Sequence, residues 1–172
     1  MSAVYEAHLH PDGSCDVYDT IEERRSGAWP SVRAWADTWL EEWRASQSGP
    51  AGHFISALTD AASPGVVEVL VVLAEAAGGD EEMLGWVGAG PIEDLVSHSG
   101  NGAGVLAEVD RAARQEPAFR AALSGAWLNA AVPDDVRDRL AQFGARDFVA
   151  EQAMTEHEFA AYVVDREAKG WH

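Results

Sequence analysis

The stretch that decides the fold is residues 31–46, SVRAWADTWLEEWRAS. Its large apolar residues recur every three or four positions, at Val32, Trp35, Trp39 and Trp43, and most of the charged residues fall between them. This spacing is typical of an amphipathic α-helix that buries one face. We therefore expect a helix here and a mainly α-helical protein around it.

The apolar run of residues 66–77 is also expected to be a helix. Ser63 and Pro64 before it are a favourable helix start, and Gly78 and Gly79 after it are a favourable stop. Five of its residues are β-branched valines, which leave a buried strand as the alternative. The length of the run and its alanine-rich end favour the helix.

Further helices are expected wherever proline, glycine or a capping residue marks an end. They cover residues 54–62, 80–86, 92–98 and 105–115, two stretches that begin at Pro117 and Pro133, and residues 156–169. The helix from Pro117 is expected to carry Phe119, Leu123 and Trp127. The last helix begins behind a capping box of Thr155 and Glu158.

The first twenty residues have a different pattern, in which polarity alternates along residues 4–10 and 14–19 around Pro11, Asp12 and Gly13. This pattern predicts a β-hairpin whose apolar face lies on the helices. With Gly13 in the left-handed conformation, Leu9 faces Cys15 and Ala7 faces Val17. The opposite face then carries Glu6, His8, His10, Asp16 and Tyr18.

At 172 residues the chain is long enough for one domain with its own core. The predicted architecture is therefore a single domain over residues 1–172: a compact multi-helix body (31–169) with an N-terminal β-hairpin (1–20). Cys15 is the only cysteine, so the domain has no intramolecular disulfide and suits a reducing cytoplasm.

The charge is strongly acidic: 12 Lys and Arg against 29 Asp and Glu give a net charge of −17. A surface of this sign repels nucleic-acid phosphates and anionic lipid head groups, so neither nucleic acid nor a membrane is an expected partner. The longest apolar run is also too short to cross a bilayer. The acidity has two interpretations: it keeps the protein soluble, which is the one that the sequence favours, or it attracts a basic protein, which is the partner class that the charge indicates.

Two later segments carry a resemblance. Residues 88–95, GAGPIEDL, and residues 119–127, FRAALSGAW, resemble an uncharacterised bacterial helical domain family with a Gly-Pro-(Leu/Ile)-Glu-Asp-Leu turn. The similar region covers roughly residues 66–140 and leaves out the hairpin and the last helix. The family has no assigned activity, so the resemblance implies a helical domain and no function.

The turn itself has a physical interpretation. Gly88 and Gly90 are expected to take positive φ and break the chain into two helices, with Pro91 in the first turn of the second. Glu93 and Asp94 would then lie at the positive end of the helix dipole. A corner between two helices, stabilised by these charges, is the interpretation that the sequence favours. The alternative is that one of the two carboxylates faces a groove and meets a cationic group.

The most metal-like group is His8, His10 and Asp16 on one face of the hairpin. A His-x-His pair with an acidic neighbour is able to supply ligands to a divalent metal. The segment HLHPDGSCD, residues 8–16, resembles the opening motif of phosphoesterases of the polymerase-and-histidinol-phosphatase type, but the further histidine and aspartate clusters of those enzymes do not follow. A solvated ion-paired hairpin face is the alternative that the sequence favours, and no cofactor is expected.

The tryptophans are the other candidate site. Trp35, Trp39 and Trp43 are expected to be mainly core, with an aromatic pocket as the alternative, and Trp29 or Trp171 is expected to stay exposed. Exposed tryptophan is enriched in protein interfaces.

These observations favour a non-enzymatic, acidic protein-interaction module, for example an immunity or inhibitor protein that binds a basic partner. One alternative is a small metal-dependent or acid–base enzyme that uses His8, His10 and Asp16 together with Glu93 or Asp94. The other is a helical accessory subunit that packs through its tryptophans.

Overall fold

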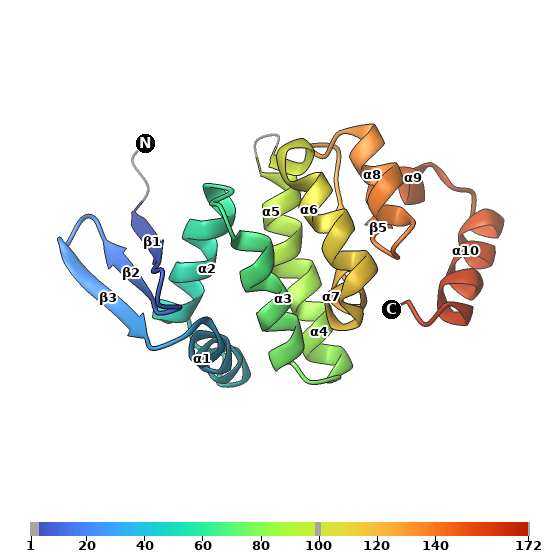
Figure 1. Ribbon diagram of the computed structural model, residues 1–172. Coiled ribbons are helices and arrows are strands. Elements are labelled where there is room, and N and C mark those ends of the chain that lie inside the picture. Colours follow the sequence, from blue (N-terminus) through green and yellow to red (C-terminus); the bar gives the residue numbers. More distant parts are fainter. Residues whose placement is uncertain (1–3, 99–100, 172) are drawn as a thin grey trace.

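The computed structural model describes residues 4–98 and 101–171, and it confirms a mainly α-helical protein with a β-structure at its N-terminus. The elements follow one another along an elongated molecule, with the sheet at one end and the last helix at the other (Figure 1). None of the helices in the described residues is long and apolar enough to cross a membrane.

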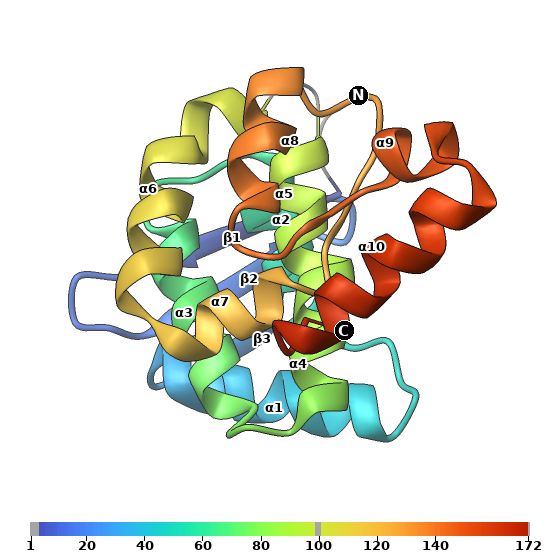
Figure 2. The same ribbon diagram turned by 90° about the vertical axis from the view of Figure 1, so that its right-hand side faces the viewer.

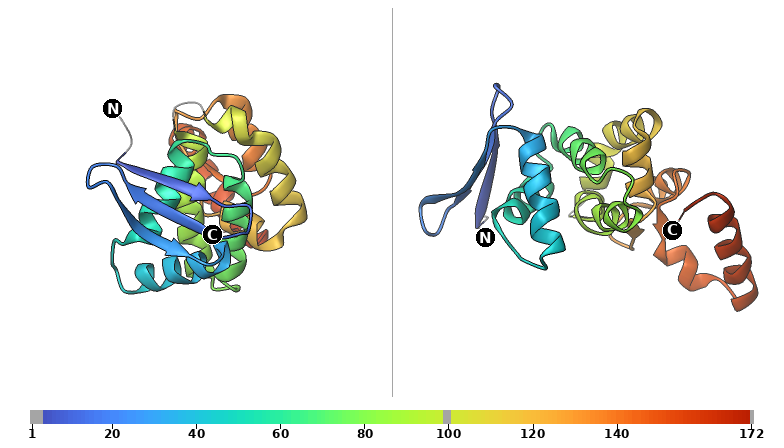
Figure 3. Two further views of the ribbon diagram at one scale, coloured as in Figure 1. Left: turned by 60° about the vertical axis from the view of Figure 1, so that its left-hand side comes forward. Right: turned by 90° about the horizontal axis from the view of Figure 1, so that it is seen from below.

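The predicted hairpin is confirmed and is extended by a third strand. Strands β1 (Tyr5–Leu9) and β2 (Cys15–Asp19) pair in the predicted register, with Leu9 opposite Cys15. β3 (Arg24–Trp29) adds an antiparallel strand to the other edge of β2. One face of this sheet packs on α1 (Val32–Arg44) and α2 (Pro50–Asp60), and the other looks away from the helices (Figure 3).

Gly27 explains why the sequence did not predict β3. The residue looks like a chain break, but it lies inside the strand. A Cβ at this position would come within 2.7 Å of Pro50 Cβ and of the Trp29 ring. The glycine therefore lets the strand approach α2 closely, and it does not mark a turn.

Helix α1 is confirmed and forms a large part of the core. Trp35 is fully buried and donates a hydrogen bond from its indole nitrogen to the Ala51 carbonyl, at 3.0 Å. Its ring also lies 5.1 Å from that of Phe54 in α2, centroid to centroid. Because a buried indole N–H needs an acceptor, this bond joins α1 to the first turn of α2.

Residues 66–76 form helix α3 (Val66–Ala76), so the helix prediction is confirmed over the strand alternative. The predicted start at Ser63 and Pro64 is wrong, because the Ser63 amide bonds back to the Leu58 carbonyl in the turn that follows α2. The cap of α3 is Gly65, at φ +84°, which turns the chain from one helix into the next.

The predicted break at residues 88–91 is wrong. Helix α4 (Glu81–Val87) continues through one π-helical turn, η1 (Gly88–Ile92), into α5 (Glu93–Ser97). Gly88 has helical backbone angles, with φ −68°, and Pro91 lies inside the wide turn. A π-turn accommodates a proline that would otherwise disrupt the helix, since the proline has no N–H to donate. Glu93 and Asp94 are therefore in mid-helix and not at a helix start.

The glycines of this segment serve close packing between helices. A Cβ on Gly88 would overlap the carbonyl oxygen of Ala122 in α7 (Pro117–Leu123). A Cβ on Gly125, just after α7, would lie 2.6 Å from the Gly85 carbonyl oxygen. The α4–η1 segment and the end of α7 thus approach closely because glycines lie at these contacts.

The second half of the molecule completes the core with α6 (Asn101–Gln115), α7 and α8 (Asp134–Ala141). Trp127 does not belong to the helix that starts at Pro117, which ends at Leu123. It lies in a two-residue strand, β4 (Trp127–Leu128), that pairs in parallel with β5 (Arg146–Asp147). α9 (Phe148–Ala153), which the sequence did not predict, follows directly.

The last helix, α10 (Glu156–Ala168), has the predicted capping box of Thr155 and Glu158. Its main anchor is the buried Arg166, which donates to the carbonyls of Gly144 (2.7 Å) and Ser124 (3.1 Å). Figure 2 shows that the chain end after α10 returns towards α4 and α7. A charged side chain therefore attaches this helix to the body.

Candidate functional site

The structure brings His8, His10 and Asp16 together as the sequence predicts. The imidazole nitrogen Nδ1 of His8 lies 2.9 Å from one carboxylate oxygen of Asp16, and Nε2 of His10 lies 3.4 Å from the other. Arg25 of β3 also reaches this carboxylate, with Nε at 3.2 Å. Burial alone would raise the pKa of Asp16, but the hydrogen bonds from the two histidines and the charge of Arg25 hold it below its usual value.

This arrangement resembles an ion-paired cluster more than a metal centre. Arg25 occupies the same carboxylate that a cation would need, and its positive charge opposes a second cation. Across residues 4–98 and 101–171, no group of three or more His, Cys, Asp or Glu side chains has the geometry to hold a metal ion. The neighbouring Cys15 is buried as predicted, and burial together with the adjacent Asp16 raises the pKa of its thiol to about 11.

The predicted tryptophans divide into two classes. Trp35 and Trp39 are buried, whereas Trp43 at the end of the same stripe keeps 41% of its surface exposed. Trp29, expected to be exposed, is partly buried against Phe54, with ring centroids 5.7 Å apart. The aromatic stripe is therefore core at one end and surface at the other.

Two further tryptophans join Trp43 on the surface. Trp86 in α4 is 44% exposed and its ring lies 5.0 Å from that of Trp43. Trp127 in β4 is 40% exposed and lines the same cavity as Trp86. We call Trp43, Trp86 and Trp127 the tryptophan face. Sequence reasoning did not single out the last two as surface residues.

A signal for Trp86 was present in the sequence. Met83, Leu84 and Val87 are the buried residues of α4, and Trp86 falls outside the stripe that they form. Glu82, Trp86 and Ala89 are spaced at i, i+4 and i+7, so they share the outward side of the helix. No comparable pattern exists for Trp127, because its exposure depends on the return of the chain at β5.

Three cavities adjoin the tryptophan face, with volumes of about 450, 650 and 300 Å³. Among the described residues that line them, five are acidic and two are basic: Glu42, Asp80, Glu81, Glu82 and Asp94 against Arg44 and Arg146. Arg44 lies 3.9 Å from Asp80, and Arg146 is ion-paired with the buried Glu151 at 2.6 Å. The surface around the tryptophans is thus aromatic and net negative.

Glu93 and Asp94, the predicted interaction carboxylates, point to different surroundings. Glu93 accepts a hydrogen bond from the backbone N–H of Trp127 at 3.0 Å, and so fixes β4 against α5. Asp94 lines the 300 Å³ cavity together with Trp39, Trp43 and His53. Burial raises the pKa of both carboxyl groups, assisted for Glu93 by Asp94 and for Asp94 by Asp60.

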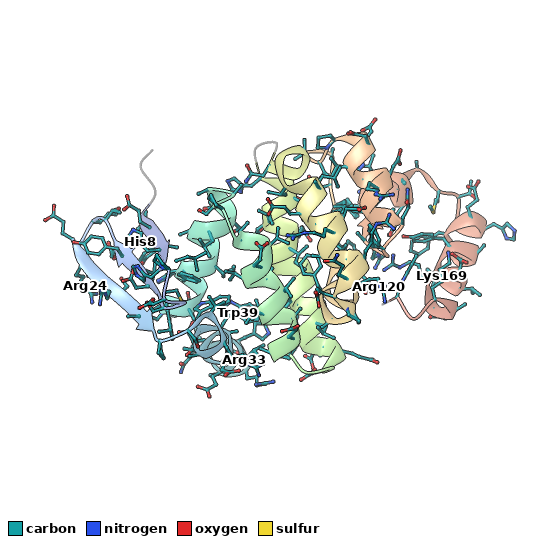
Figure 4. All side chains as sticks on the ribbon, viewed as in Figure 1. His8, Arg24, Arg33, Trp39, Arg120 and Lys169 are labelled. Atoms are coloured by element: carbon teal, nitrogen blue, oxygen red, sulfur yellow. The ribbon has the colours of Figure 1, made fainter. Side chains whose placement is uncertain are left out.

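The histidine cluster and the tryptophan face lie apart. His8 is on the sheet at one end of the molecule, Trp39 is on helix α1, and Lys169 marks the far end (Figure 4). None of the three cavities is lined by His8, His10 or Asp16. The fold therefore does not combine these residues with Glu93 or Asp94 in one of the cavities at the face.

One comparison with known proteins gives a match. A family model described as a family of unknown function, DUF6869, matches residues 53–148. The matched region is wider than the stretch in which the sequence resembles an uncharacterised family. It contains Trp86 and Trp127 but not the N-terminal sheet β1–β3, Trp43 or α10. No curated protein and no solved structure gives a significant match.

Proposed function

Because this chain belongs to the DUF6869 family, whose function is unknown, we propose a function from its surface: it is a protein-interaction module that binds a basic partner through the tryptophan face. An immunity or inhibitor protein that neutralises a cationic protein is the type of function that this proposal covers. The partner would present lysine or arginine side chains to the acidic cavities.

The observation that carries the proposal is the exposure of three tryptophans on one connected surface. Each keeps 40–44% of its area accessible, although tryptophan normally buries most of its ring. Tryptophan and arginine are the residues most enriched at interaction hot spots, because a large rigid ring buries much apolar area at little entropic cost. A second molecule on this face would cover these rings.

The charge of the chain supports a basic partner. The net charge of −17 attracts a positively charged surface and speeds its approach. The excess of carboxylates around the tryptophans places part of that charge at the proposed contact. Aromatic faces also attract cations directly through their quadrupole. Ring stacking, ion pairing and apolar burial would then act together in one complex.

The proposal is tested by affinity capture from the source cells with three immobilised proteins. These are the wild type, the double variant Trp43→Ala/Trp86→Ala, and a control, Phe159→Ala, whose ring is 39% exposed on α10 and lines none of the three cavities at the face. We expect a basic protein that the wild type and the control capture at low salt, that elutes as salt rises, and that the double variant does not retain. Equal capture by all three proteins, or capture that salt does not weaken, would contradict the proposal.

A further inference from the structure

The 450 Å³ cavity at the tryptophan face has a construction that goes beyond a general binding surface. Its wall includes Trp86 of α4 and Trp127 of β4. Gly85, Ala89 and Gly125 also line it, and the absence of any side chain larger than a methyl group at these positions leaves room in the cavity. All of these residues belong to the matched family region, and among the described residues that line the cavity only Gly170, which follows α10, lies outside that region.

One end of the cavity is negatively charged. Glu81 and Glu82 come from the first turn of α4 and precede Trp86 by about one helical turn. Residues at i and i+4 lie above one another on a helix, so the Glu82 carboxylate and the Trp86 ring share one side of α4. A cation that enters here meets an aromatic ring and a carboxylate together.

The cationic residue in the wall is already neutralised. Arg146 donates two hydrogen bonds to the Glu151 carboxylate, from Nε at 2.9 Å and Nη2 at 2.6 Å. Its guanidinium also lies 4.0 Å from the centroid of the Trp127 ring. The charge of Arg146 is therefore matched by Glu151, and one face of the Trp127 ring is already covered by this guanidinium, which leaves Trp86 as the ring for an incoming cation.

From these observations we infer that the cavity binds an arginine side chain of the protein partner, with its guanidinium at Trp86 and Glu82. This inference rests on the proposed function and specifies which residue of the partner enters. Arginine fits better than lysine because its planar guanidinium stacks on an aromatic ring and pairs in bidentate fashion with a carboxylate. The methylene stem would lie against Gly85 and Ala89.

The inference is tested with defined peptides, independently of any partner. The probes are the blocked pentapeptide Gly-Gly-Arg-Gly-Gly and the same peptide with lysine or with citrulline, the neutral analogue of arginine. The readout is the NMR signal of each tryptophan indole N–H, assigned with single Trp→Phe variants. We expect the arginine peptide to shift the signals of Trp86 and Trp127, the lysine peptide to bind more weakly, and the citrulline peptide to leave both signals unchanged.

Variants locate the binding. Trp86→Ala is expected to lower the affinity for the arginine peptide about tenfold, because the ring contact is lost. Glu82→Gln, which keeps the shape of the side chain but removes its charge, should lower this affinity several-fold. The matched control is Glu108→Gln, an exposed carboxylate on α6 that lines none of the three cavities at the face, and it should leave binding unchanged. Retained indole signals elsewhere in the spectrum show that each variant is folded.

The outcomes separate the two proposals. Equal shifts with the arginine and citrulline peptides, or shifts that Glu82→Gln leaves unchanged, would overturn the arginine site. If the peptides do not bind but a basic partner is still captured in a Trp43- and Trp86-dependent manner, the interaction module stands and the arginine site fails. If the arginine peptide binds as expected while no basic partner is captured, the cavity stands as a site and the proposed function fails.

Discussion

At the scale of single residues, Gly88 is a position where the addition of one methyl group is expected to destabilise the folded protein. Gly88→Ala places a methyl group against the Ala122 carbonyl oxygen, between two backbones that cannot separate without moving α7. We expect a loss of about 1–3 kcal/mol in the free energy of unfolding, the usual effect of overpacking. Urea denaturation followed by circular dichroism measures it.

Gly90→Ala is the matched control for this substitution. Gly90 lies two residues further on in the same π-turn, and a Cβ there has no neighbour within 4 Å. Alanine also favours helical backbone by up to about 1 kcal/mol over glycine. We therefore expect Gly90→Ala to be neutral or stabilising. A similar loss of stability in both variants would show that the π-turn itself, and not the contact with α7, requires glycine.

Residue contacts within the hairpin were predictable, and those between distant segments were not. His8, His10 and Asp16 meet because strand pairing fixes their positions, so an alternating pattern and a turn were sufficient. Arg25 was missed because it reaches Asp16 from a strand that the sequence did not indicate. The shared cavity of Trp86 and Trp127 depends on how α4 meets the end of α7, which no local pattern encodes.

At the scale of secondary structure, α10 is attached to the body by a charge cluster around Glu151 in addition to the Arg166 anchor. Glu151 of α9 receives hydrogen bonds from Arg146 and, at 3.0 Å, from the Tyr162 hydroxyl of α10. Burial would raise the pKa of Glu151, but these hydrogen bonds hold it below its usual value. A carboxyl group with a lowered pKa stabilises the folded state at neutral pH, and this contribution is lost as pH falls through the folded-state pKa.

We therefore expect acidification to loosen α10 before the body unfolds. The Trp171 indole signal reports this, because the ring packs on Gly144 and lies 5.9 Å from the Arg166 guanidinium. Glu151→Gln should lower the free energy that holds α10 on the body by about 2 kcal/mol at neutral pH. It should also remove most of the pH dependence of the Trp171 signal. Glu167→Gln, an exposed carboxylate on the same helix, is the control and should behave as wild type. A Trp171 signal with the same pH response in all three proteins would refute the role of Glu151.

The elements with strong local signals were predicted well. The periodicity of α1, the valine-rich α3 and the capping box of α10 each gave the correct element. The failure at residues 88–92 has a physical cause: glycine and proline usually end helices, but here tertiary packing against α7 and a wide turn keep the helix intact. Short elements such as β4, β5 and α9 depend on contacts with distant residues and have no periodicity of their own.

At the scale of the whole molecule, charge is the dominant feature. With a net charge of −17 on 172 residues, the acidic side chains repel one another more strongly in the compact folded state than in the expanded unfolded chain. Added salt screens this repulsion, since the Debye length falls to about 10 Å at 0.1 M ionic strength. We expect the melting temperature to rise by about 3 °C, or ~1 kcal/mol, between very low and physiological salt.

Differential scanning calorimetry in sodium chloride measures this effect, and sucrose at matched osmolality is the control for non-ionic stabilisation. A melting temperature that falls with sodium chloride would show that the surface ion pairs outweigh the general repulsion. The expected rise is opposite to the expected effect of salt on partner binding, which weakens as salt increases. The two measurements together therefore separate folding from association.

The arrangement of the indole rings also makes the protein its own optical reporter. The rings of Trp39, Trp43 and Trp86 follow one another at 5.6 and 5.0 Å, across the junction of α1 and α4. Indoles at this separation couple their electronic transitions and produce paired bands of opposite sign in circular dichroism. A movement of α1 against α4, or a ligand that inserts between the rings, would change this couplet. The chain thus needs no attached dye to show when its exposed aromatic surface is occupied.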